Sequence, residues 1–125
     1  MKPMGILIKS EKSGDEIRDK FSNLINFFDI KIFNTETTKD KIQQHLWYLD
    51  RVDIIVIDFE RDLSSVNKHL IEYVIIMTYA ASRDKIVLTV TDDSFLKDNE
   101  WIKYFSYKNF DDLNLVVDYI QNTFI

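Results

Sequence analysis

Short runs of apolar residues alternate along this chain with segments of helical period, and this alternation limits the folds open to it. The run Ile54-Ile55-Val56-Ile57 is apolar at every position, which is typical of a central parallel strand covered on both faces. The same criteria predict five strands, over Gly5–Lys9, Asp29–Phe33, Asp53–Asp58, Lys85–Val90 and Ile102–Tyr107. Because crossovers between parallel strands are nearly always right-handed, we expect a parallel sheet with helices on both faces.

The segments between these runs carry helix signals. Ser13-Gly14-Asp15-Glu16 has the form of a capping box, and Asp111-Asp112 precedes a final helix with one apolar face. A short helix is predicted within Asp92–Trp101. The whole pattern predicts an α/β fold, a flavodoxin-like, doubly wound three-layer sandwich with a five-stranded parallel sheet. Residues 1–125 are expected to form a single domain, because their number suits one core.

Composition excludes several classes of function. The formal net charge of −5 gives no general attraction to phosphate backbones, so direct binding of nucleic acid is not expected. The chain has only two glycines, Gly5 and Gly14, and one proline, Pro3. Both glycine-rich phosphate-binding motifs, the dinucleotide-binding fingerprint and the P-loop, are therefore missing. No apolar run is long enough to cross a membrane. The N-terminus has no signal-peptide pattern, which predicts a cytoplasmic location.

Polar side chains stand where the predicted strands end. Glu11 follows the first strand and Asp58 closes the third, so their carboxylates could share a hard cation such as Mg²⁺. Thr89 and Lys108, at the ends of the fourth and fifth strands, could hold the oxygens of a phosphoryl group on Asp58. The alternative for each residue is that its polar side chain has no function and is simply solvated in a loop at the strand end.

These residues resemble the receiver domain of response regulators. Val52-Asp53-Ile54-Ile55-Val56-Ile57-Asp58 is similar to the family's third strand, and Val87-Leu88-Thr89 is similar to its fourth. The segment from Phe105 to Leu113 resembles the aromatic–x–x–Lys–Pro–Phe signature around the fifth strand. The resemblance implies that Asp58 is the phospho-acceptor, that Thr89 and Lys108 contact the phosphoryl group and that Phe105 is an aromatic switch.

The chain also departs from this family. Ser10 replaces one of two acidic residues, so Mg²⁺ binding by Glu11 and Asp58 should be weak. Asn109 replaces the usual proline, and Val90 replaces a small residue. The resemblance therefore implies an atypical receiver-like signalling domain, in which phosphorylation of Asp58 is weak or absent.

Such a domain would act by protein–protein interaction through the face formed by the fourth strand, the helix after it and the fifth strand. Its partner would be a histidine kinase or a downstream effector, and the formation of a homodimer is left as an open alternative.

A second resemblance leads to a different class of function. Nucleoside deoxyribosyltransferase-like and TIR-like domains share this layout and use a glutamate on the helix after the third strand, which here would be Glu72. Glu72 would then act as nucleophile or base on an N-glycosidic bond. Because Glu72 falls between apolar positions and the solvent side of its helix, a solvated carboxylate is the expected state. An exposed aromatic patch containing Trp47, Tyr48 and Trp101 is a further alternative to ordinary core packing.

Overall fold

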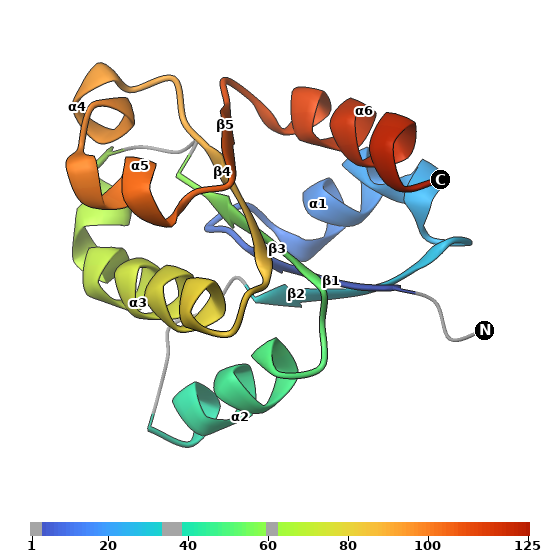
Figure 1. Cartoon of the computed structure of the whole chain (residues 1–125), viewed down its shortest axis with the longest axis horizontal. Coiled ribbons are helices and arrows are strands. Elements are labelled where there is room, and N and C mark those ends of the chain that lie inside the picture. Colours follow the sequence, from blue (N-terminus) through green and yellow to red (C-terminus); the bar gives the residue numbers. More distant parts are fainter. Residues whose placement is uncertain (1–3, 34–38, 60–62) are drawn as a thin grey trace.

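The computed structural model describes residues 4–33, 39–59 and 63–125, and in them five strands form one parallel sheet (Figure 1). The strand order is β2-β1-β3-β4-β5, and all four neighbouring pairs are parallel. The strands are β1 (Met4–Lys9), β2 (Phe28–Phe33), β3 (Ile54–Asp58), β4 (Ile86–Val90) and β5 (Lys108–Phe110). The predicted α/β fold of the flavodoxin-like type is confirmed.

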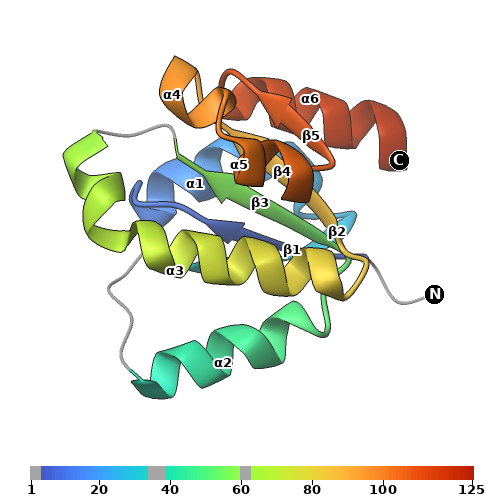
Figure 2. The same cartoon turned by 60° about the vertical axis from the view of Figure 1, so that its left-hand side comes forward.

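Helices cover both faces of this sheet (Figures 1 and 2). One face carries α1 (Gly14–Lys20), the short 3₁₀ helix η1 (Ser22–Leu24) and α6 (Leu113–Phe124). The other face carries α2 (Lys39–Leu49) and α3 (Leu63–Ser82), with α4 (Ser94–Lys97) and α5 (Glu100–Phe105) beside the β4–β5 edge. No helix in the described ranges is long and apolar enough to cross a bilayer.

Two apolar cores lie above and below the sheet. Alternate residues of β3 divide between them, since Ile54 and Val56 pack toward α1 and α6 whereas Ile55 and Ile57 pack toward α2 and α3. This double burial explains why the β3 sequence is apolar without alternation. The predicted helix starts hold as well: the Ser13 hydroxyl accepts from the Glu16 amide, and Asp112 caps α6.

The prediction of a fifth strand over Ile102–Tyr107 is wrong. Residues Glu100–Phe105 form α5, and β5 is a three-residue strand that begins only at Lys108. The Asn99 side chain accepts hydrogen bonds from the amides of Trp101 and Ile102, which begins a helix at this point. The helix expected within Asp92–Trp101 is accordingly two short helices, α4 and α5.

Candidate functional site

Asp58 closes β3 at the carboxyl end of the sheet, and its carboxylate is buried, with 1% of its surface exposed. The Ser10 hydroxyl donates to Asp58 Oδ2 over 2.7 Å. The Lys12 ammonium lies 3.3 Å from the same oxygen, and Lys12 is itself only 8% exposed. The Lys12 amide donates to the Ser10 hydroxyl over 3.0 Å, so the turn after β1 holds both groups against Asp58.

Two of these contacts were not predicted as such from sequence. The sequence identifies Ser10 only as the loss of an acidic ligand, and it predicts no role for Lys12. The available signal was a lysine two residues after a strand-end serine, where β1 and β3 pair in parallel and end together. The chain thus brings a cation of its own to the position where a metal ion was expected.

Glu11, the second expected metal ligand, is turned toward α3. Its Oε1 accepts a hydrogen bond from the Tyr73 hydroxyl at 3.1 Å. Burial is the main cause that raises the pKa of the Tyr73 phenol far above its ordinary value, and the neighbouring carboxylates of Glu11, Asp58 and Glu72 raise it further. These carboxylates therefore share one region of the molecule.

The donor set does not favour Mg²⁺. Across the described segments of the chain, no three His, Asp or Glu side chains gather in a way that could hold a metal ion. The Lys12 ammonium beside Asp58 would repel a divalent cation. The residues around Asp58 therefore do not fit a magnesium ion.

Thr89 lies in β4 beside β3, but its hydroxyl belongs to a different network. It donates to Asn109 Oδ1 over 2.9 Å and accepts from the Ser106 hydroxyl at 3.1 Å. Thr89 pairs with Ile57, whereas Asp58 pairs with Val90. Because neighbouring residues of a strand point to opposite faces, the side chains of Thr89 and Asp58 leave the sheet on different sides.

Lys108 was expected at the end of the fifth strand, but it is the first residue of β5. It pairs with Leu88, which in turn pairs with Val56, two residues before Asp58. Its ammonium lies 4.8 Å from the ring centre of Tyr119 and 5.5 Å from that of Phe110. The cation seen beside Asp58 is Lys12, and the expected convergence of Asp58, Thr89 and Lys108 on one pocket is not observed.

Phe105, the expected aromatic switch, stands at the end of α5 and not in a strand. It is partly buried, and its ring stacks with that of Trp101, with 5.9 Å between ring centres. The strand geometry on which the switch assignment depended is therefore absent at Phe105.

Glu72 is not the solvated helix carboxylate that was expected. Its side chain is 14% exposed, and Oε1 lies 2.6 Å from the ammonium of Lys9, which is fully buried at the end of β1. The two atoms are close but not aligned as a hydrogen bond. His45 Nδ1 lies 4.0 Å from the same oxygen, and Phe33 stacks on the His45 ring. Glu72, Lys9 and His45 thus form a buried polar cluster between β1, α2 and α3.

Comparison with known proteins shows similarity at the level of structure. No protein-family model matches the chain, and no curated protein matches it either. A crystal structure of a Burkholderia pseudomallei protein, described provisionally as pilus assembly-related, superposes with a TM-score of 0.59 at 15% sequence identity. The match covers 95% of this chain and 87% of the other. At this identity the likeness shows that the two chains share a fold.

Proposed function

We propose that this chain is a receiver-like docking domain that works without phosphorylation of Asp58. The proposal rests on one observation: the Asp58 carboxylate accepts a hydrogen bond from the Ser10 hydroxyl and forms an ion pair with the Lys12 ammonium. Transfer of a phosphoryl group to a carboxylate needs an accessible oxygen and a cation to bind the transferred group. Here one carboxylate oxygen accepts from Ser10 and faces Lys12, and the residue is buried.

Lys12 supplies in a fixed form the positive charge that a receiver obtains from a bound metal ion and a phosphoryl-binding lysine. An internal ammonium does not depend on a phosphodonor or on the concentration of Mg²⁺. The domain would therefore hold one conformation at all times and would not switch between two. A constant conformation suits a domain whose role is to position a partner protein.

The proposed docking surface is the groove between α3 and the α4–α5 pair. Its volume is about 400 Å³, and it is lined mainly by apolar and aromatic side chains, those of Val74, Thr78, Leu96, Asn99, Trp101, Ile102 and Phe105. Trp101 is 69% exposed and Tyr104, beside it, 81% exposed. Exposed aromatic residues of this kind anchor many protein interfaces.

Charge indicates the chemistry of the partner. The segment 92–105 that borders the groove carries four acidic residues, Asp92, Asp93, Asp98 and Glu100, against the two lysines Lys97 and Lys103. We therefore propose a partner protein that inserts an apolar side chain flanked by basic residues. The structural neighbour is described as pilus assembly-related, and we propose by analogy that the partner belongs to an assembly or signalling complex reached from the cytoplasm.

Two measurements test this function. Mass spectrometry after incubation with acetyl phosphate and Mg²⁺ should find no phosphoryl group on Asp58; stoichiometric labelling that is lost in Asp58→Asn would refute the proposal. A photo-crosslinking amino acid at Tyr104 should capture one protein through a basic, apolar segment. The same label at the exposed Asp19 on α1 is the control, and equal capture from both positions would exclude the groove as the docking surface.

A further inference from the structure

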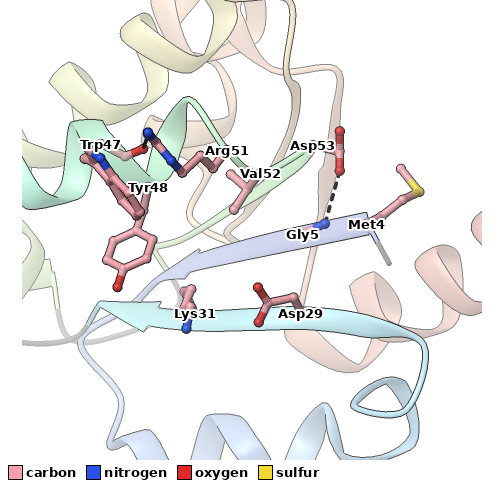
Figure 3. A pocket seen from close by; sticks show the side chains of 9 residues that line it. All are labelled: Met4, Gly5, Asp29, Lys31, Trp47, Tyr48, Arg51, Val52 and Asp53. Carbon is pink, nitrogen blue, oxygen red and sulfur yellow. Dashed lines mark hydrogen bonds between the residues drawn. The ribbon is translucent and has the colours of Figure 1, made fainter. Parts of the chain in front are cut away.

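A second concave site lies at the amino ends of the strands, at the opposite end of the sheet from Asp58 (Figure 3). Its volume is about 670 Å³, within the range of roughly 300–1,000 Å³ that is typical of small-molecule sites. The walls come from the first residues of β1 and β2, the end of α2 and the segment before β3. Nothing in the proposed docking function uses this pocket.

Two cations of the pocket are held by aromatic rings. The Arg51 guanidinium lies 3.5 Å from the ring centre of Trp47 and donates to the Trp47 carbonyl oxygen over 2.8 Å. The Lys31 ammonium lies 5.5 Å from the ring centre of Tyr48. Within residues 4–33, 39–59 and 63–125, neither cation has a carboxylate within ion-pair distance. Both positive charges therefore lie over aromatic rings and are available to an anion.

The carboxylates of the pocket lie apart from these rings. In Figure 3, Trp47, Tyr48 and Arg51 lie on one side, whereas Asp53 and Met4 lie on the other, with Asp29 on β2 below. Asp53 Oδ2 accepts from the Gly5 amide at 3.1 Å, which fixes that wall. Asp29 and Lys31 are two residues apart on β2, so their side chains leave the same face of the strand. One end of the pocket is positive and aromatic, and the other end offers hydrogen-bond acceptors.

From this division of charge we infer that the pocket binds a small anion that carries a planar ring, of the chemical class of a nucleoside monophosphate. The phosphate would lie between Lys31 and Arg51, where a guanidinium provides paired donors. The ring would pack against the exposed surface of Trp47, which is 49% exposed, or of Tyr48. Hydroxyl or amino groups of the ligand would donate to Asp29, and these bonds would add to those made by the phosphate group.

The probes are adenosine monophosphate, adenosine and inorganic phosphate, and the reporter is the fluorescence of Trp47. The chain has two tryptophans, so Trp101→Phe removes the other emission without touching this pocket. Adenosine monophosphate should change the Trp47 emission and bind at least about tenfold more tightly than either adenosine or phosphate, because only it uses both halves of the site. Equal affinity for adenosine monophosphate and for phosphate alone, or no binding of adenosine monophosphate, would overturn the inference.

Matched variants separate the pocket from general electrostatics. Lys31→Met and Arg51→Met should each weaken binding of adenosine monophosphate by about tenfold or more. Lys108→Met and Arg83→Met remove cations that also lie over tyrosine rings, at Tyr119 and Tyr79, but outside this pocket. These two controls should bind as the parent protein does. If all four variants lose affinity equally, the site is not the one described. Circular dichroism confirms that each variant is folded, and phosphorylation of Asp58 has no bearing on the result.

Discussion

At the scale of single residues, the contact between Lys12 and Asp58 should have a measurable energetic consequence. Lys12→Met removes the cation from a buried carboxylate, and loss of one member of a buried ion pair costs about 3–5 kcal/mol. We expect urea denaturation to show a loss of this order. The control Lys103→Met, at a lysine that is 61% exposed, should change the free energy of unfolding by less than about 0.5 kcal/mol. Adding Asp58→Asn to Lys12→Met should restore much of the loss, since a neutral amide needs no cation.

The buried pair of Lys9 and Glu72 distinguishes a structural role from a catalytic one. Glu72→Gln leaves the fully buried Lys9 ammonium without its carboxylate, and we expect a loss of about 3–5 kcal/mol in the free energy of unfolding. The double variant Lys9→Met/Glu72→Leu should recover most of it, because an apolar pair has no charge to bury. Release of base from nucleosides by the wild-type protein, abolished in Glu72→Gln, would instead establish the N-glycosidic function.

At the scale of elements, α5 should depend on its cap. Asn99→Ala removes the acceptor for the amides of Trp101 and Ile102, and loss of such a cap costs about 0.5–2 kcal/mol. Because α5 carries Trp101 and Ile102 into the proposed docking groove, the same variant should also weaken partner binding. Asn114→Ala, at an exposed position in α6, is the control and should leave both stability and binding unchanged.

The contrast between β3 and β5 shows what the sequence can predict at this scale. β3 is apolar at four successive positions because it is covered on both faces, a pattern that few other structures produce. The stretch Ile102–Tyr107 is also rich in apolar and aromatic residues, but six residues fit a strand or a short helix equally well. Asn99 decides between them by capping, and Ile102 and Phe105 then share the buried side of α5.

The site was less predictable than the fold, for a physical reason. The position of Asp58 at the end of a central strand can be predicted from the apolar run Ile54-Ile55-Val56-Ile57 that precedes it. That Lys12 reaches Asp58 depends on the turn after β1 and on β1 lying next to β3 in the sheet. Glu72 was predicted to be solvated because a helix pattern does not reveal the buried Lys9 across from it.

At the scale of the whole molecule, stability should decrease in strong alkali. The pKa of the Tyr73 phenol is raised in the folded protein, so above pH 10 the unfolded chain loses this proton first. The contribution of Tyr73 is therefore intact below pH 10 and is lost as the pH rises further. Tyr73→Phe should show a shallower fall in urea stability above pH 10, despite a lower overall stability from the lost bond to Glu11. The exposed Tyr104→Phe should keep the wild-type slope.

The most direct test of the account is a crystal structure of the protein grown with Mg²⁺ and beryllofluoride, which together mimic a phosphorylated aspartate. We predict that the Lys12 ammonium and the Ser10 hydroxyl stay on the Asp58 carboxylate, with neither ion bound there. Beryllofluoride on Asp58, with Mg²⁺ beside it and Lys12 displaced, would contradict the claim that this domain works without phosphorylation.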